Sequence, residues 1–280
     1  MSAKNILSGT EKRTDMHLHT WYSDGSMSPR DVVKWAAARG LEVISVTDHD
    51  GVNGIDEALS AGREFGISVI PGIELSSEMP EGTGVHILGY GIDHRNSELL
   101  SVCGELKKKR ARRNRELLKV LAELGWPVTD NDLLFRRGQD YVGKPMIARA
   151  LAGKGYIEDP RDAFKDGGIF TMSPVRKVKK GKISAEKAVR LILNAGGMPV
   201  LAHPGKIRGI GEKESQTFFD NVERIITVLS GFGLKGMECR YSQHSDAEVR
   251  AFLNIARKHR LIVTSGSDFH GPELSDIREK

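Results

Sequence analysis

Short apolar segments that end in histidine or carboxylate residues recur along this chain and constrain its fold more than any other feature. The clearest is 41–47, which reads LEVISVT and is followed directly by DHD at 48–50. Helix signals separate such segments: Ser28 and Pro29 are typical of a helix start, and Gly40 of a helix end. Repeated strand–helix units predict an α/β fold with a parallel sheet. Closing that sheet into a barrel would bring the polar strand ends to one face.

The alternation extends over both ends of the chain. We expect strands at 15–19, 41–47, 67–70, 85–90, 198–202, 236–240 and 261–265. We expect helices at 29–39, 55–65, 185–195, 218–232 and 246–259. The central part differs, because a long basic helix at 99–124 and shorter helices at 146–152 and 160–164 follow one another without strands. We therefore predict a barrel formed by 1–97 and 181–280, with 98–180 as a mostly helical insertion that covers the active site.

The composition bounds the class of protein. Hydrophobic residues make up 39% of the 280 residues, enough for a sizeable core, and no apolar run reaches membrane-spanning length. The amino terminus lacks the apolar centre of a signal sequence, so we expect a cytoplasmic protein without a membrane partner. Neither Cys103 nor Cys239 lies in a CxxC pair, which argues against a thiolate zinc site. The net charge of +5 leans modestly toward an anionic partner.

The first histidine motif is HLH. His17 and His19 lie two apart on a predicted strand, so both rings point to the same face and could bind one metal ion. Asp24 follows in a predicted turn, where an aspartate that serves the turn alone is the alternative. His49 lies in TDHD, directly after the second strand, where capping of the loop is the alternative.

Further candidate ligands lie on or after later strands. Glu74 belongs to GIE, and His86 lies in a predicted strand, where a hydrogen-bonded histidine of the core is the alternative. AHP places His203 at a strand end, and SDFH places Asp268 and His270 two apart after the last strand. Each motif alone is weak evidence. Titratable residues at five or more strand ends are costly unless they share a partner, and together they predict a metal site.

Taken in order, these motifs resemble the PHP (polymerase and histidinol phosphatase) family, and most of all its TrpH-like members. The matching segments are HLH at 17–19, TDHD at 47–50, GIE at 72–74, His86, AHP at 202–204 and SDFH at 267–270. The early acid, Asp24, also matches the TrpH-like pattern. The resemblance spans nearly the whole chain, including the insertion. It implies a distorted (β/α)7 barrel and a metal-dependent phosphoesterase.

The resemblance also implies a cluster of two or three divalent ions. It assigns His17, His19, Glu74 and Asp268 to one ion, Glu74, His86 and His203 to a second, and Asp24, His49 and His270 to a third. Glu74 would bridge the first two ions. Mixed imidazole and carboxylate ligands suit Mn²⁺, which we expect, or Fe²⁺ or Zn²⁺, better than Mg²⁺ or Ca²⁺.

The chemistry follows from such a cluster. A metal-bound hydroxide attacks the phosphorus, while the ions hold the phosphoryl oxygens and neutralise developing charge. The resemblance implies a phosphomonoesterase for nucleotides, either 5′-monophosphates or 3′,5′-bisphosphates. The alternative with the same metals is a 5′→3′ exoribonuclease on short RNA, which a basic insertion would help. A non-catalytic nucleic-acid-binding module is a third hypothesis, and the complete set of ligands argues against it.

Two candidate substrate contacts lie in the insertion segment GKPMIARAL. Lys144 and Arg149 belong to this segment, which resembles a TrpH-like segment that usually reads GRPHIARAL. Lysine binds phosphate without the bidentate fork of arginine, and Met146 replaces a histidine. If the family residues touch substrate, this chain has altered that contact.

The remaining candidate contacts come from the long helix and from a late strand end. Arg112 and Asn114 belong to the basic run KKKRARRNR, for which a solvated helix face is the alternative. Tyr241 and His244 follow a strand in ECRYSQHS, with a supporting or surface role as the alternative. The expected partner is a phosphorylated small molecule, a nucleotide above all, with an RNA oligonucleotide as the alternative.

Overall fold

The computed structural model describes residues 13–133 and 141–272, which form a nearly closed barrel and a helical layer above it. The strands are β1 (Thr14–Leu18), β2 (Val43–Val46), β3 (Ser68–Glu78), β4 (Gly84–Tyr90), β5 (Ile183–Ser184), β6 (Met198–Leu201), β7 (Gly236–Tyr241) and β8 (Ile262–Gly266). Their order is β1-β2-β3-β4-β6-β7-β8, with β5 beside β3. A bridge between Leu18 and Phe269 joins the two edges, so the expected α/β barrel is confirmed.

The sheet is mixed, and the expectation of an all-parallel sheet was wrong at one strand. β4 runs antiparallel to both of its neighbours, β3 and β6, whereas β1, β2 and β3 pair in parallel, as do β6, β7 and β8. The physical reason is the connection between β3 and β4. It is a tight turn in which Met79 N donates to Thr83 O, and it leaves no room for a crossover helix.

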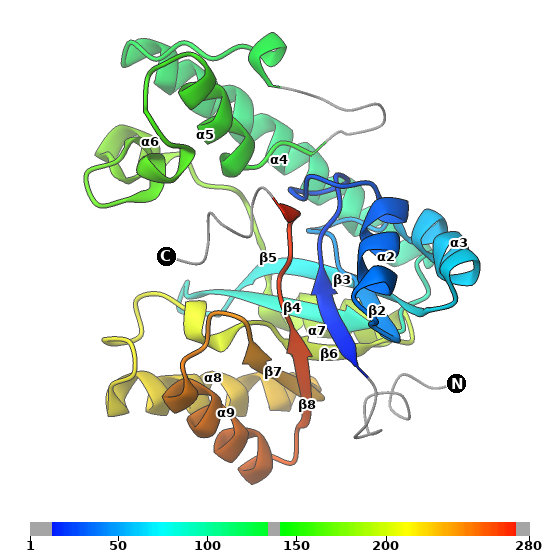
Figure 1. Cartoon of the computed structure of the whole chain (residues 1–280). Coiled ribbons are helices and arrows are strands. Elements are labelled where there is room, and N and C mark those ends of the chain that lie inside the picture. The colour runs from blue at the N-terminus through cyan, green and yellow to red at the C-terminus, as the bar shows by residue number, and fades with distance from the viewer. Residues whose placement is uncertain (1–12, 134–140, 273–280) are drawn as a thin grey trace.

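Helices cover the outside of the sheet. α2 (Pro29–Ala38) and α3 (Ile55–Phe65) pack together beside the first strands, and α8 (Gln216–Phe232) and α9 (Asp246–Lys258) lie beside the last ones (Figure 1). α7 (Ala185–Asn194) packs against β3, β4 and β6. These helices confirm the expected ones. Their starts follow local signals, since Ser28 caps α2 by accepting from Asp31 N.

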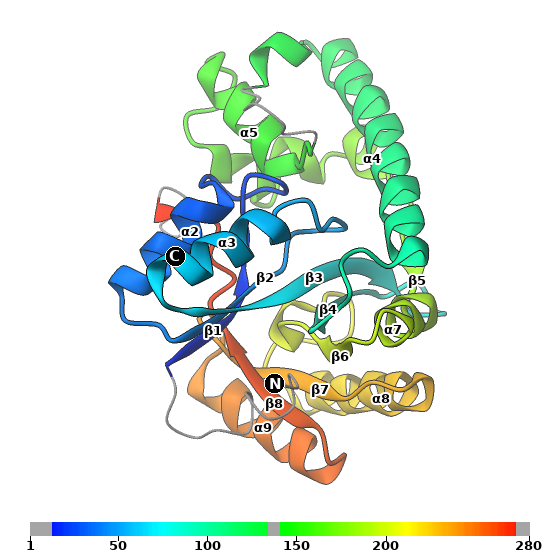
Figure 2. The same cartoon turned by 90° about the vertical axis from the view of Figure 1, so that its right-hand side faces the viewer.

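The central segment is mostly helical. It contains α4 (Ser97–Glu123), α5 (Lys144–Gly153), α6 (Ser173–Lys177) and the short 3-10 turns Asp130–Asp132, Pro160–Phe164 and Ile169–Thr171. α4 rises from the side of the barrel to the layer above the strand ends (Figure 2). Its first half adds Leu99 and Leu106 to the barrel core, and its second half adds Leu117 and Leu121 to a separate apolar core with α5 and α6. α4 therefore packs in both apolar cores and joins the helical layer to the barrel.

Among residues 13–133 and 141–272, no helix combines the length and the apolar character that crossing a membrane requires.

Candidate metal centre

The HLH motif leaves β1 with both histidine rings turned into the barrel mouth. His17 and His19 are fully buried, and their ring centroids are 5.1 Å apart. This is the placement that spacing by two on a strand predicts. Asp268 lies between them and the last strand, with Oδ1 3.1 Å from His19 Nε2 and 3.5 Å from His17 Nε2.

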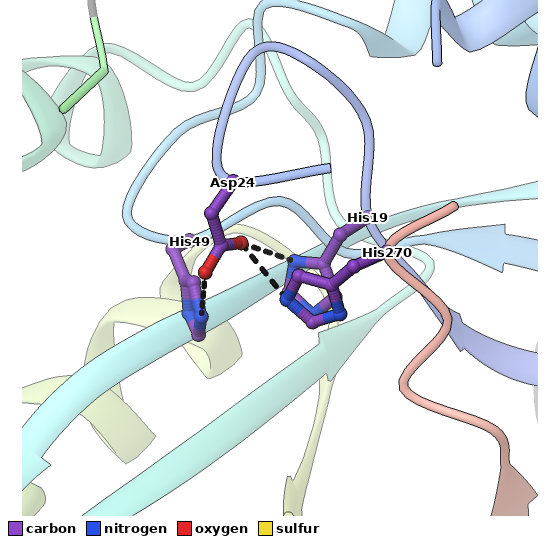
Figure 3. Close-up of side chains that lie close together, drawn as sticks. All are labelled: His19, Asp24, His49 and His270. Carbon is purple, nitrogen blue, oxygen red and sulfur yellow. Dashed lines mark ion pairs between the residues drawn. The ribbon is translucent and has the colours of Figure 1, made fainter. Parts of the chain in front are cut away.

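Asp24 lies at the centre of a second group, which Figure 3 shows. Its carboxylate oxygens lie 2.9 Å from His270 Nε2, 3.8 Å from His49 Nε2 and 3.8 Å from His19 Nδ1. The loop that carries Asp24 is fixed by buried Asp48. The Asp48 carboxylate accepts hydrogen bonds from the backbone and side chain of Thr20 and from the Ser23 hydroxyl.

Glu74 joins this group to the remaining ligands. Its Oε1 lies 2.7 Å from His86 Nδ1 and 2.9 Å from His203 Nε2. Its Oε2 lies 2.7 Å from His49 Nδ1, on the opposite side of the carboxylate. Each oxygen thus faces a different set of imidazoles, as a carboxylate that bridges two ions must.

Unsatisfied buried atoms test whether these residues fit metal ions. Within the described part of the chain, His17 Nε2, His19 Nε2, His49 Nδ1 and Glu74 Oε2 are buried and have no hydrogen-bond partner. Glu74 Oε2 and His49 Nδ1 approach without hydrogen-bond alignment. Buried polar atoms left without a partner are costly, and divalent ions would satisfy all four at once. The donor set therefore fits a metal cluster.

All nine expected ligands meet at this place. Four overlapping groups have ligand atoms within 4.8 Å of one another: His19, Asp24, His49 and His270; His17, His19 and Asp268; His17, Glu74 and His203; and His49, Glu74 and His86. His17, His19, His49 and Glu74 each belong to two groups, so they lie between neighbouring positions. The assignment of each residue to a particular ion stays a prediction.

Local charges keep the acidic members of the cluster ionised. Burial alone would raise the pKa of Glu74, but the neighbouring imidazoles of His49, His86 and His17 hold that pKa well below its usual range. The pKa of Asp24 is held down in the same way by His270 and His49, again against the effect of burial. Both side chains are therefore carboxylates at neutral pH, the form that binds a cation.

Glu238 supports the cluster and was missed by the sequence analysis. It is fully buried, and its carboxylate accepts from His17 Nδ1 at 3.0 Å and from the backbone N of His203 at 2.7 Å. A proton held on Nδ1 leaves Nε2 of His17 free to bind a metal. The available signal was an acidic residue within the otherwise apolar first half of the strand GMECRY.

Strained backbone occurs at the same strand ends. His203 has φ 22° and Asp268 has φ 55°, in the left-handed region that non-glycine residues rarely adopt. Such conformations persist where surrounding contacts hold them, and they cluster at functional sites. Here Glu238 holds the backbone of His203, while Lys206 Nζ and Tyr241 Oη both reach Asp268 Oδ2, at 2.7 and 3.1 Å.

Asp50 links the helical insertion to the loop beside the candidate metal centre through two ion pairs. Its buried carboxylate accepts from Arg110 of α4 and from Lys180 of the returning chain, both at 2.5 Å, and from Ser76 N at 2.8 Å. Asp50 follows His49 directly in the chain. Arg110 and Lys180 of the insertion are therefore both bound to the loop that carries the candidate ligand His49.

The expected substrate contacts fall into two kinds. Asn114, Tyr241 and His244 all contact other protein groups: Asn114 donates to Val142 O, Tyr241 donates to Asp268, and His244 accepts from Gly205 N at 3.2 Å. Arg112 lies on the exposed face of α4, and Lys144 and Arg149 are half-buried in α5. Met146 is 6% exposed and packs in the apolar core of the insertion, so its side chain serves packing.

Tyr141 is a further residue that the sequence analysis did not single out. Its ring stacks on His49 with centroids 6.2 Å apart, and the Arg110 guanidinium lies over the same ring, 3.9 Å from its centre. Arg113 is buried nearby on the same face of α4. The insertion thus presents an aromatic ring to His49, with two buried arginines near that ring, which no motif in the sequence indicates.

The chain matches the family model described as the PHP domain over residues 15–141. It is 32% identical to a 3′,5′-nucleoside bisphosphate phosphatase of Chromobacterium violaceum, covering 92% of this chain and 87% of the relative. It is 31% identical to a phosphoribosyl 1,2-cyclic phosphate 1,2-diphosphodiesterase of Eggerthella lenta, covering 92% and 94%.

Two further similarities bear on the reaction. The chain is 30% identical to a 5′-3′ exoribonuclease of Haemophilus influenzae, covering 93% of this chain and 91% of the relative. Among solved structures, a Bifidobacterium adolescentis protein assigned as a metal-dependent phosphoesterase superposes with a TM-score of 0.81 at 30% identity, covering 93% and 88%. By their names, all four of these proteins act on phosphate esters.

Proposed function

Because the chain belongs to the PHP family and is a phosphoric ester hydrolase, we propose that it releases phosphate from nucleotides at the described cluster. The substrates would be 5′-monophosphates or 3′,5′-bisphosphates. Glu74 carries the proposal, since its two oxygens face separate sets of imidazoles. The nine clustered residues are the proposed ligands of two or three ions, with Mn²⁺ as the expected metal.

The chain's own groups have defined tasks in this proposal. Bound divalent ions supply an activated water and neutralise the charge of the phosphoryl group. Glu238 keeps the proton of His17 on Nδ1, and Asp48 holds the loop of Asp24 in place. Tyr141 shields the cluster from one side, because it is 7% exposed and stacks on His49.

Two cationic side chains of the insertion, Arg113 and Lys144, favour a nucleotide substrate. Arg113 is only 8% exposed, and no carboxylate in the described part of the chain forms an ion pair with it. The pKa of Lys144 is lowered by burial and then by the charges of Arg113 and Arg208. Positive charges that crowd one another without neutralisation attract a polyanionic ligand. The name of the Chromobacterium violaceum relative fits such a ligand.

A second candidate function is 5′→3′ exoribonuclease activity. Lys108, Arg112 and Arg115 are exposed and follow one another by four and three residues, so they form one stripe on the outer face of α4. A stripe of positive charge on the outer surface of the insertion suits an extended polyanion better than a mononucleotide. Contacts of this kind make binding strongly salt-dependent.

Phosphate release from a defined panel tests both functions. Metal-stripped protein is assayed with Mn²⁺, and then with EDTA, on nucleoside 5′-monophosphates, 3′,5′-bisphosphates and 5′-phosphorylated oligoribonucleotides. Manganese-dependent release from mononucleotides alone supports the phosphatase. Stepwise shortening of oligomers that weakens steeply with salt supports the exonuclease. No metal-dependent hydrolysis of any substrate would contradict both.

Glu74→Gln tests the bridging role. We expect turnover to be lost and the metal content, measured by elemental analysis, to fall, because an amide cannot hold two cations on two anionic oxygens. Glu78→Gln is the matched control, since Glu78 is the exposed last residue of the same strand. Wild-type rates in Glu74→Gln would refute a bridging Glu74.

A further inference from the structure

A cavity of about 180 Å³ opens beside the metal centre, between the loop after β2 and the first half of α4. His49, a proposed metal ligand, lines it together with Asp50, so the cavity borders the place where a phosphoryl group would bind. We propose that this cavity binds the base of the nucleotide and so selects nucleotides over simpler phosphate esters. The assignment depends on the proposed function. Apart from His49 and Asp50, the residues that line the cavity lie outside the motifs of the metal centre.

One face of α4 forms the outer wall of the cavity. Leu100, Cys103, Gly104 and Lys107 line it, and their spacing of three, one and three residues places all four on the same side of the helix. The stripe faces Val52 and Asn53 of the loop after β2. Asp50 holds the two walls at a fixed separation, because it binds Arg110 one turn further along α4.

The chemistry of the walls suits a heteroaromatic ring. Val52 and Cys103 are buried apolar groups, and Leu100 is 46% exposed, which is unusual for a large apolar side chain here. Asn53 places an amide at the exposed rim, where donors and acceptors can meet the edge of a base. Arg110 lines the same cavity, where its guanidinium is paired with Asp50.

The size of the cavity restricts the ligand further. Pockets for whole drug-sized molecules begin at about 300 Å³. A cavity of about 180 Å³ therefore takes one ring system rather than a complete nucleotide. The sugar would then span the distance from the cavity to the cluster, with the phosphate at the ions.

Gly104 allows a test that fills the cavity from its wall. A Cβ at Gly104 meets nothing within 4 Å, so a larger side chain enters open space without a clash. Leucine is also a better helix former than glycine, so Gly104→Leu should fold. Gly231→Leu is the matched control, because Gly231 lies in α8 and a Cβ there also meets nothing within 4 Å.

The measured quantity is the ratio of kcat/KM for a nucleoside 5′-monophosphate to kcat/KM for ribose 5-phosphate, which lacks the base. Loss of contacts to one base is worth roughly tenfold to hundredfold in binding, so we expect Gly104→Leu to lower the ratio by that factor. Asn53→Ala should lower it in the same direction. Gly231→Leu should keep the wild-type ratio.

Two outcomes would overturn the base subsite: an unchanged ratio in Gly104→Leu, which includes an equal loss on both substrates, or a wild-type ratio near one. If neither of these substrates nor a nucleoside 3′,5′-bisphosphate is hydrolysed, the proposed function fails instead. The subsite is then tested separately by saturation-transfer NMR of adenosine. Adenosine binding that disappears in Gly104→Leu supports the subsite, and binding equal in both proteins refutes it.

Discussion

Replacing Glu238 by glutamine should weaken the metal centre without removing a ligand. The carboxylate has two tasks, since it accepts from His17 Nδ1 at 3.0 Å and from His203 N at 2.7 Å. Glutamine offers only one acceptor oxygen. If that oxygen serves His203 N, the amide NH2 faces His17 Nδ1 and draws the His17 proton to Nε2, where it blocks metal binding. In the opposite orientation, the amide NH2 meets the His203 N–H, and two donors face each other.

The size of the effect follows from these contacts. A hydrogen bond to a charged acceptor is worth about 1.5–3 kcal/mol, and the partners of metal ligands typically affect metal affinity by about tenfold to hundredfold. The two figures agree, because tenfold corresponds to about 1.4 kcal/mol. We therefore expect Glu238→Gln to bind Mn²⁺ about 10 to 100 times more weakly, with activity partly restored at high Mn²⁺.

Calorimetric titration of metal-stripped protein with Mn²⁺ measures this affinity, and kcat/KM is followed over a range of Mn²⁺ concentrations. Glu223→Gln is the control, because it also breaks a glutamate–histidine contact, to His259 Nε2 at 2.9 Å, between α8 and α9. A folded Glu238→Gln protein with wild-type Mn²⁺ affinity and wild-type activity would refute the proposed role of Glu238 in holding the His17 tautomer.

Two other properties follow from buried charges outside the proposed ligands. Asp50→Asn should destabilise the fold by about 3–5 kcal/mol in urea unfolding, because it leaves buried Arg110 and half-buried Lys180 without their shared carboxylate. Asp56→Asn, at an ion-paired side chain that is 65% exposed, should cost less than about 1 kcal/mol, and equal losses would contradict the first expectation. Burial lowers the pKa of His244 to about 4, below the 6.5 of an unfolded chain, so the unfolded state binds the proton more readily between these values. The contribution of neutral His244 to the free energy of unfolding should therefore be fully present above pH 6.5 and fall by up to about 3 kcal/mol toward pH 4. The His244→Gln variant should lose this pH dependence. Identical pH profiles of unfolding for both proteins would exclude His244 as the cause.

Much of the site could be read from the sequence because its signals are local. Spacing by two on a strand fixes the common direction of the His17 and His19 rings, and a polar residue directly after an apolar strand lies at the sheet edge whatever the rest of the chain does. The same holds for the helix starts, where the cap and the first turn are neighbours in the chain. The strand–helix alternation and the approximate extent of the helical insertion also rest on local patterns.

Tertiary structure decided what local patterns leave open. The pairing of Glu238 with His17 spans 221 residues, and that of Arg110 with Asp50 spans 60, so no spacing rule joins them. Helical periodicity separates Arg110 and Arg113 from Arg112, but only packing against Tyr141 and the barrel determines which of these faces is buried. The antiparallel direction of β4 was also left open by local patterns. One short turn after β3 reverses the chain there, whereas the other strands of the sheet are joined by crossovers. The sequence by itself thus determined which residues could bind metal, and the packing of distant segments determined how those residues are held and what surrounds them.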